Sequence, residues 1–442
     1  MNLFRFTIPV NASVSAPGGE CALTLEARRY EDGFSERIRV WSASGAHEEP
    51  LTLCAHGVRP GAAAALLIHP WRIELWADGR LCDEEWPDGP LALDDVPAPR
   101  LIAAGLVPTC DPAADDRANL PLRAPDFHTD CGISANDAPE RIIGQLLSKN
   151  GENPAEGWKP SDPGVFAGDC MPYTDTDPDG VERYHVLYLK DRRHHRSKWH
   201  KGAHQWAHMS TRDFKNWDLH PLAVSIDDPS EGSICTGSWL KTADGTHYLY
   251  YTVRQIDNAP APILRSVSED GYRFRRDPQF RIELSDRYHG PSARDPKIVR
   301  SKDRAEDGCF HMFVTTSLMT GELAGRGCLA HLISRDGKTW EETEPIYISP
   351  DGDQPECSDY FALNGWYYLI FSHRGRGQYR ISEKPFSEWR TPADPDIPCE
   401  SVPKMALWNG RILFTGFHRI EGYAGTLTFT EARQDPDGSL KF

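Results

Sequence analysis

The sequence predicts an all-β protein in which a five-bladed β-propeller is preceded by an N-terminal β-sandwich. Two observations lead to this prediction: a turn segment recurs four times between residues 210 and 389, and a separate group of alternating strands precedes residue 86. Helix signals are weak, and the best candidate for a short helix is residues 138–147, where Pro139 stands near the first turn.

The recurring segment consists of a serine, a polar turn and an aromatic residue, and its copies start at Ser210, Ser268, Ser334 and Ser382. Asp-Gly and Pro-containing turns between short apolar runs are typical of β-hairpins. Small sheets repeated about every 50 residues are typical of β-propellers. Residues 125–442 have room for five such units. The alternative is a stack of unrelated hairpins in a β-sandwich.

The first part of the chain has a different pattern. Residues 21–27 and 71–80 alternate between apolar and polar side chains, with turn signals about ten residues apart, which is typical of a β-sandwich. Eight prolines between Pro87 and Pro125 indicate a linker. We therefore expect residues 1–118 to form the sandwich and linker, and residues 119–442 to form the propeller as the catalytic domain.

Composition excludes several classes of protein. The 442 residues carry a formal net charge of −16, which argues against a nucleic-acid partner because phosphate contacts need clustered cations. The chain has no apolar run long enough to span a membrane, and its first residues lack the features of a secretory signal. Its eleven cysteines form no Cys-x-x-Cys pair, so we expect reduced thiols and a cytoplasmic location.

Three acidic residues, Asp169, Asp295 and Glu356, stand at matching places, each at the opening of an apolar strand. A fold keeps carboxylates there only with partners or with a use for their charge. Inner strands of a propeller start at one end of a central funnel, so we expect these carboxylates to converge on one pocket that holds a sugar ring. Two carboxyl groups about 5 Å apart make a retaining glycosidase, and a wider gap gives inversion. A third can bind sugar hydroxyls more tightly in the transition state.

Four ordered motifs then resemble glycoside hydrolase family 32, the invertase and fructanase family. Residues 206–217, followed by His220-Pro221-Leu222-Ala223, are similar to its Trp-Gly-His-x-x-Ser-x-Asp-Leu-x-x-Trp block. The other three motifs are Cys235-Thr236-Gly237-Ser238, which resembles Phe-Ser-Gly-Ser, Arg294-Asp295-Pro296, which reproduces Arg-Asp-Pro, and residues 356–361, which resemble Glu-Cys-Pro-Asp-Leu-Phe.

This resemblance implies a retaining hydrolase or transferase that acts on the terminal β-fructofuranosyl unit of a short fructoside. Asp169 would be the nucleophile, Asp295 the transition-state stabiliser and Glu356 the acid/base. A small carbohydrate is the expected partner, a homo-oligomer is an open possibility, and no cofactor and no metal are expected. The predicted substrate-binding residues are Arg192, Trp199, Trp206, His208, Ser238 and Arg294.

The sequence departs from the family pattern near the nucleophile. Gly168-Asp169-Cys170-Met171-Pro172 replaces Asn-Asp-Pro-Asn-Gly, and residues 189–192 replace Gln-Tyr-Asn-Pro. The sandwich also precedes the propeller rather than following it. These changes argue against plain sucrose or long inulin as the substrate. Two alternatives stay open: a furanosidase for another sugar such as arabinofuranose, and a non-catalytic sugar-binding propeller.

Two further features have more than one interpretation. Residues 190–201 hold six lysines and arginines. One interpretation is a solvated hairpin tip, and another is a contact with the sandwich or with a second subunit. A third is a rim that binds an anionic group of the substrate. Histidines in and after this segment match no standard metal spacing. Cys357, beside Glu356, either packs in the core or helps to set the pKa of the acid.

Overall fold

The computed structural model of the 442-residue chain describes two parts. In the first 164 residues it describes the strands β1 to β10 and Arg72, and from Val165 onward it describes every residue except 193–203, 215–216, 227, 229, 302–307, 399–400 and 421. The short helix expected over residues 138–147 lies outside these residues. Among the described residues, no helix has the length and apolar character that a membrane span requires.

The N-terminal part is a β-sandwich, as the alternating pattern predicts. Strand β5 of one sheet contacts β7 and β8 of the other, so that two sheets face each other. The five-stranded sheet has the order β8 (Arg80–Glu85), β7 (Ile73–Ala77), β6 (Ala63–Ile68), β1 (Asn2–Thr7) and β9 (Val107–Pro108). The four-stranded sheet has the order β2 (Asn11–Ser15), β3 (Cys21–Arg29), β4 (Glu36–Ser42) and β5 (Leu51–Val58).

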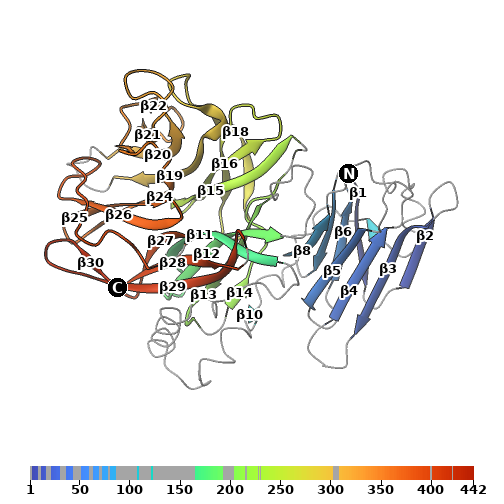
Figure 1. Ribbon diagram of the computed structural model, residues 1–442. Coiled ribbons are helices and arrows are strands. Elements are labelled where there is room, and N and C mark those ends of the chain that lie inside the picture. The colour runs from blue at the N-terminus through green and yellow to red at the C-terminus, as the bar shows by residue number, and fades with distance from the viewer. Residues whose placement is uncertain are drawn as a thin grey trace.

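The C-terminal part consists of five antiparallel blades (Figure 1), and the pairing of Ala167 with Gly425 joins the first and the last blade into one nine-stranded sheet. Blade 1 contains β11 (Val165–Thr176), β12 (Glu182–Arg192), β13 (Gln205–Thr211) and β14 (Trp217–Leu219), with β10 (Pro121–Leu122) on its edge. Blade 2 contains β15 (Glu231–Lys241), β16 (His247–Gln255), β17 (Ile263–Ser268) and β18 (Arg275–Ile282). A short 3-10 helix, η4 (Gly290–Ser292), leads to blade 3.

The remaining blades follow the same plan. Blade 3 contains β19 (Arg294–Arg300), β20 (Phe310–Ser317) and β21 (Gly327–Ser334), with β22 (Glu341–Glu342) and β23 (Tyr347–Ile348) both paired to β21. Blade 4 contains β24 (Glu356–Leu363), β25 (Trp366–His373) and β26 (Arg376–Ser382). Blade 5 contains β27 (Ser401–Trp408), β28 (Arg411–Arg419), β29 (Gly425–Gln434) and β30 (Leu440–Lys441).

The five blades form a ring. Each inner strand contacts the inner strand of the next blade, in the order β11, β15, β19, β24 and β27, and β27 contacts β11. A separate apolar cluster fills the space between each pair of neighbouring blades, including the pair formed by blades 5 and 1. Burying one large apolar side chain contributes about 1.5–3 kcal/mol, so these clusters stabilise the contacts between the blades of the ring.

Two of the four recurring turn segments share one geometry. The hydroxyl of Ser268 accepts a hydrogen bond from the Gly271 amide at 2.9 Å, and the hydroxyl of Ser334 does the same for the Gly337 amide at 2.9 Å. Both glycines have positive φ, of 76° and 69°, which side chains rarely adopt. These two turns are therefore equivalent, and the ring of blades shows that the unrelated-hairpin alternative is wrong.

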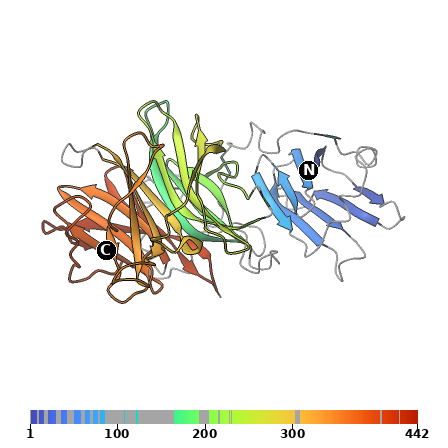
Figure 2. The same cartoon turned by 90° about the horizontal axis from the view of Figure 1, so that it is seen from above.

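The sandwich lies beside blades 1 and 2 (Figures 1 and 2). Lys190 donates a hydrogen bond of 2.6 Å to the carbonyl of Leu81, and the Gln205 amide donates one of 2.8 Å to Glu84. β9 pairs with the sandwich and β10 with blade 1, on either side of the boundary that we placed between residues 118 and 119. That boundary stays a prediction.

Candidate active site

Every inner strand of the ring begins with a β-bulge. In each case the ladder to the second strand of the blade places two inner-strand residues opposite one, which bends the strand and re-aims its side chains. The bulged pairs are Gly168-Asp169 in β11, Cys235-Thr236 in β15, Asp295-Pro296 in β19, Cys357-Ser358 in β24 and Val402-Pro403 in β27.

The three predicted catalytic acids occupy different positions relative to the bulge of their strand. Glu356 is the residue before the bulge, Asp295 is its first residue and Asp169 its second. The three acids therefore do not stand at the matching places that the sequence analysis expected. Their positions relative to the bulge differ by one residue from Glu356 to Asp295 and by one more from Asp295 to Asp169. The positions differ in exposure, since Asp295 is 2% exposed, Asp169 is partly buried and the side chain of Glu356 is 50% exposed.

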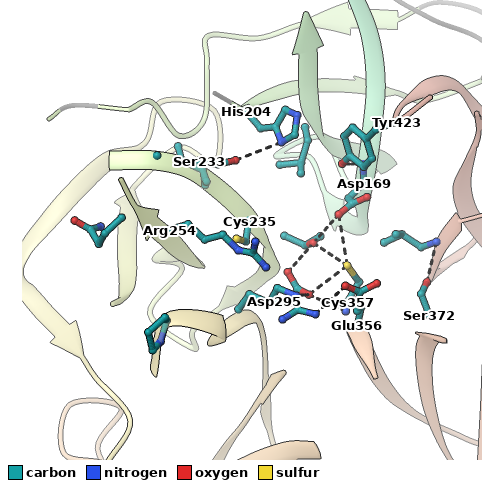
Figure 3. Close-up of a pocket in the computed structure, with 18 of the residues that line it drawn as sticks. Asp169, His204, Ser233, Cys235, Arg254, Asp295, Glu356, Cys357, Ser372 and Tyr423 are labelled. Atoms are coloured by element: carbon teal, nitrogen blue, oxygen red, sulfur yellow. Dashed lines mark hydrogen bonds and ion pairs between the residues drawn. The ribbon is translucent and has the colours of Figure 1, made fainter. Parts of the chain in front are cut away.

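Side chains from two other bulges join the acids (Figure 3). The Thr236 hydroxyl lies 3.0 Å from Asp169 Oδ2 and 3.0 Å from Asp295 Oδ1, and its single proton serves one of them at a time. The Cys357 amide donates a hydrogen bond of 3.0 Å to Asp295 Oδ2. The Cys357 thiol lies 3.5 Å from Asp169 and 3.4 Å from Asp295, so it stands between the two carboxylates.

Arg294 connects the buried and the exposed acid. Its guanidinium lies 3.5 Å from Asp295 and donates to Glu356 Oε1 at 2.7 Å, while Gln354 accepts a further bond at 2.6 Å. Burial alone would lower the pKa of Arg294, but the charges of Asp295 and Glu356 outweigh it and raise that pKa. The arginine therefore stays charged and fixes the direction of the Glu356 carboxylate.

Tyr423, from the loop between β28 and β29, lies against the first acid. The Asp169 amide donates a hydrogen bond of 3.2 Å to its hydroxyl oxygen. A Cβ atom at Gly168 would stand 2.6 Å from this oxygen, so the tyrosine fits only because residue 168 has no side chain. In the family motif that residues 168–172 replace, the residue before the nucleophile is asparagine. The altered motif therefore makes room for a hydroxyl beside the predicted nucleophile.

A cavity of about 510 Å³ opens over these groups. This volume is in the range of small-molecule sites. Its lining includes Asp169, Asp295, Glu356, Arg294 and Tyr423, together with Arg254 of blade 2. The structure thus brings the three predicted catalytic acids and Arg294 into one cavity.

The site raises the pKa of two of its groups, Asp169 and Cys357. Burial and the neighbouring charge of Asp295 raise the pKa of Asp169, while hydrogen bonds from Tyr423 and Thr236 lower it in part. Burial and the two aspartates raise the pKa of the Cys357 thiol well above its ordinary value, so the sulfur is a neutral thiol at physiological pH. The structure therefore places the Cys357 thiol against the two aspartates, and the charge of the neighbouring Glu356 also raises the pKa of this thiol.

Three of the predicted substrate-binding side chains lie away from this lining. Trp206 is fully buried between blades 1 and 2, and its indole donates to the Cys235 carbonyl at 3.0 Å. The Ser238 hydroxyl donates to Pro296 and accepts from the Ile298 amide, both at 2.9 Å, which ties blade 2 to blade 3. Both side chains therefore bind neighbouring backbone groups and do not line the cavity.

His208 belongs to a buried cluster with His185 and His220. Its Nε2 atom lies 3.0 Å from His185 Nδ1 and 3.3 Å from the Tyr173 hydroxyl. Burial lowers its pKa to about 3, so the ring is neutral. The three histidines stand close enough to hold a metal ion, as do Asp351, Asp353 and His373 at the surface. Neither group lines the cavity of the three acids.

The last two predicted residues carry no side-chain description. Arg192 is the last residue of β12, and its side chain lies outside the described part of the chain. Trp199 lies outside the described residues.

Sequence reasoning missed several functional contacts. Thr236 belongs to the same motif as Ser238, and only the register of the bulge shows that Thr236 is the one that faces the funnel. Lys404 is 3% exposed and donates to the carbonyls of Gly237 and Ser358 at 3.0 and 3.2 Å, which joins blades 2, 4 and 5. A lysine inside an apolar inner strand was the available signal for this contact.

The fold and site together define a β-propeller with a funnel of three carboxylates, and comparisons with known proteins agree. Residues 176–385 match the sequence model of the "Glycosyl hydrolases family 32 N-terminal domain". These residues are therefore similar to glycoside hydrolase family 32 over somewhat less than half of the chain. The match contains Asp295 and Glu356, whereas Asp169 and Tyr423 lie outside it.

Curated relatives point in the same direction. The chain is 26% identical over 220 residues to a sucrose-6-phosphate hydrolase of Escherichia coli, which covers 45% of this chain and 41% of that protein. It is 25% identical over 200 residues to the insoluble β-fructofuranosidase CWINV1 of Arabidopsis thaliana, which covers 42% and 32%. The match thus spans less than half the length of these relatives.

A solved structure shows the same fold at low sequence identity. Levansucrase of Bacillus subtilis superposes with a TM-score of 0.50 at 12% identity, covering 64% of this chain and 86% of that one. This likeness concerns the fold alone.

Proposed function

We propose that the protein is a retaining glycoside hydrolase that cleaves or transfers the terminal β-fructofuranosyl unit of a short fructoside. One observation carries the proposal: Asp169, Asp295 and Glu356, from three different blades, line a single cavity in which shared hydrogen bonds join them. The names of the family and of its curated relatives support this choice of sugar.

In the first step Asp169 attacks the anomeric carbon of the fructofuranosyl unit, and the glycosidic C–O bond breaks. Glu356 gives its proton to the departing oxygen, a role that suits the most exposed of the three acids. The product of this step is a fructosyl ester of Asp169. In the second step Glu356 takes a proton from water or from an acceptor sugar, whose oxygen attacks the ester and restores the Asp169 carboxylate.

Asp295 has a different task. Its carboxylate is buried and fixed by the Cys357 amide and the Thr236 hydroxyl, so it meets the sugar hydroxyls without reorganising. Hydrogen bonds of this kind accelerate a reaction when they strengthen as charge develops on the ring. Arg294 holds Glu356 toward the same ring. Contacts of Arg192 and Trp199 with substrate, a cytoplasmic location and a homo-oligomeric assembly remain parts of the proposal.

The test is hydrolysis of an aryl β-fructofuranoside by the purified chain, with an aryl arabinofuranoside in parallel. We expect turnover of the fructoside, and methanolysis followed by NMR should give the β-methyl fructoside, which shows retention. Preferred turnover of the arabinofuranoside would contradict the sugar assignment. An α-methyl product would contradict the role of Asp169 as nucleophile. Absence of turnover together with measurable sugar binding would support the non-catalytic alternative.

A further inference from the structure

Three polar side chains in the wall of the cavity are joined by hydrogen bonds that the mechanism above does not use. His204 Nε2 lies 2.9 Å from Asp191 Oδ1, and His204 Nδ1 lies 3.4 Å from the Ser233 hydroxyl. His204 and Ser233 line the cavity, whereas Asp191 does not line it and has a side chain that is 8% exposed. We call these three residues the cavity-wall network.

The network is assembled from segments of two blades. Asp191 is near the end of β12, His204 stands directly before β13, and Ser233 is in β15 of blade 2. Asp191 belongs to the segment 189–192, where this sequence has aspartate in place of the asparagine of the family pattern. The His204 carbonyl also accepts a hydrogen bond of 3.3 Å from the Ile234 amide, so that the backbone holds His204 beside the start of β15.

The sandwich supports the network from the other face of the same two strands. Lys190 and Gln205 are opposite each other in the ladder between β12 and β13, and both bond to the sandwich. Asp191 follows Lys190 and His204 precedes Gln205, and side chains alternate between the two faces of a strand. The residues that hold the sandwich are thus the direct neighbours of residues that form the network.

The chemistry of the three groups gives their hydrogen bonds a direction. An ionised carboxylate can only accept, so the Nε2 atom of His204 carries a hydrogen and donates it to Asp191. The Nδ1 atom of the neutral ring is then an acceptor, and the Ser233 hydroxyl donates to it. With its hydrogen directed at His204, the Ser233 oxygen offers lone pairs to the cavity. It is therefore an acceptor for a hydroxyl group of the substrate.

The network lies on the side of the cavity that holds the predicted nucleophile. In Figure 3 the His204 ring lies between Ser233 and Tyr423. The ring centroids of His204 and Tyr423 are 5.0 Å apart, and the Tyr423 hydroxyl accepts a hydrogen bond from the Asp169 amide. A leaving group departs from the face of the sugar opposite to the nucleophile. The fructosyl unit, and not the leaving group, therefore meets this wall.

We propose that the cavity-wall network is a specificity site in which Ser233 accepts a hydrogen bond from a hydroxyl group of the fructosyl unit. Ser233 contacts the sugar, and His204 and Asp191 are positioning residues that fix the direction of its hydroxyl. A site built to bind a substrate hydroxyl discriminates against an analogue that lacks this group. The inference rests on the proposed function for the identity of the sugar, whereas the acceptor role of Ser233 comes from the network.

The kinetic test compares an aryl β-fructofuranoside with its 1-, 3-, 4- and 6-deoxy derivatives. The measured quantity is the selectivity ratio, which is kcat/KM of the parent compound divided by kcat/KM of a derivative. For one derivative this ratio should fall about tenfold in Ser233→Ala, which corresponds to about 1.4 kcal/mol, and the other ratios should not change. His204→Leu should lower the same ratio, and the double variant should lower it no further than Ser233→Ala does.

A pair of variants tests Asp191. Asp191→Leu removes the acceptor of His204 Nε2 and should lower the same selectivity ratio severalfold. Asp191→Asn keeps an oxygen that can accept this hydrogen bond, so it should retain most of the ratio. A link with only a structural role would lower kcat/KM of the parent and of its derivatives equally. Equal losses of the ratio in the two variants would overturn the positioning role of Asp191.

Ser230→Ala is the matched control, because Ser230 is an exposed serine near the start of β15 that does not line the cavity. Its selectivity ratios should equal those of the wild type. Ser233→Ala removes one oxygen atom at a partly buried position, so we expect it to fold. Four unchanged ratios in Ser233→Ala would overturn the specificity site.

Calorimetric titration separates the specificity site from catalysis. The ligands are methyl β-fructofuranoside and its four deoxy derivatives, and the proteins carry Asp169→Asn so that the glycosidic bond stays intact. The protein with Ser233 should bind the parent more tightly than one derivative, and Ser233→Ala should reduce this preference about tenfold. That result in a protein whose wild type turns over no fructoside would contradict the proposed function while supporting the specificity site. Preferences that Ser233→Ala leaves unchanged would overturn the site, and absence of binding would contradict both proposals.

Discussion

The acids of blade 1 and blade 3 reach the same cavity through different local sequences. Asp295 lies in an unaltered Arg-Asp-Pro motif, is 2% exposed and receives a backbone amide from Cys357. Asp169 lies in an altered motif, is partly buried and is held by the hydroxyls of Thr236 and Tyr423. The two carboxylates thus enter the funnel from different residues of the same kind of bulge, and different partners hold each of them.

The backbone is strained at three of the five bulges. Asp295, Cys357 and Val402, each the first residue of its bulge, have positive φ angles of 57°, 54° and 50°. For residues other than glycine such a conformation costs of order 1–3 kcal/mol and is found mainly at functional sites. Blade-to-blade contacts such as the Cys357 amide on Asp295 help to hold it. The variants below test the comparison, starting with the largest expected effect.

Asp169→Asn and Glu356→Gln should each lower kcat by roughly a thousandfold or more, since nucleophilic and general-acid steps are lost. Activity toward an aryl β-fructofuranoside is the measurement, and circular dichroism checks that the fold is intact. Turnover within tenfold of the wild type in either variant would remove the assigned role from that residue.

Asp295→Asn should reduce kcat by roughly a hundredfold and change KM less, because its contacts strengthen in the transition state. Steady-state kinetics separate the two parameters. A rise in KM with kcat preserved would mean that the intact motif of blade 3 binds substrate and does nothing more, which would remove the functional contrast with Asp169.

Gly168→Ala should lower kcat/KM about tenfold, because the new methyl group would stand 2.6 Å from the Tyr423 hydroxyl and displace either Tyr423 or Asp169. The matched variant is Tyr423→Phe, which removes the hydroxyl oxygen. In the double variant the methyl group meets a smaller ring edge, so we expect less loss than the two single losses combined. Additive losses would mean that Gly168 and Tyr423 act separately.

The pH dependence should distinguish the two acids as well. The raised pKa of Asp169 predicts that activity falls with acidity at a pH above the ordinary aspartate value of 3.8. The Tyr423 hydroxyl lowers this pKa, so Tyr423→Phe should move the acid limb of kcat/KM to higher pH. An acid limb that stays in place would separate the tyrosine from the ionisation of Asp169.

The smallest expected effect concerns stability. A raised carboxyl pKa means that the folded protein binds the proton more tightly than the unfolded chain, so ionisation of Asp169 opposes folding above the folded-state pKa. Asp169→Asn should therefore raise the Tm at neutral pH, by roughly 2 °C for each kcal/mol recovered. The gain should vanish below pH 3.8, and a gain that persists there would indicate another cause.

Much of the architecture could be predicted because its signals are local. Repeated Ser–turn–aromatic segments predicted the blades, and short motifs predicted Asp295, Glu356 and Arg294 in one site. Contacts across the ring could not be predicted in this way, since Tyr423 is 254 residues from Asp169 in the chain, and Thr236 is 67 residues away. A sequence motif also does not show which side of a strand faces the funnel.

Trp206 illustrates that limit, because a tryptophan in a recognised motif fits either a sugar platform or a core. Its indole N–H is satisfied by the Cys235 carbonyl and its ring is fully buried, so packing determines its place. The basic segment shows a related limit. Lys190, the first residue of this segment, donates a hydrogen bond to the sandwich. The charge pattern alone allowed this contact as one of several interpretations.

The repeated bulge also has a consequence for how such a pocket changes over time. Blade 5 repeats the same backbone device, but Val402 and Pro403 stand where blades 3 and 1 have Asp295 and Asp169. Val402 lines the cavity. Blade 5 thus has the same backbone bulge as the other blades, but the two residues of its bulge have apolar side chains. One substitution there would give the protein a fourth functional group, and a different preference for substrates, without a new loop or a new fold.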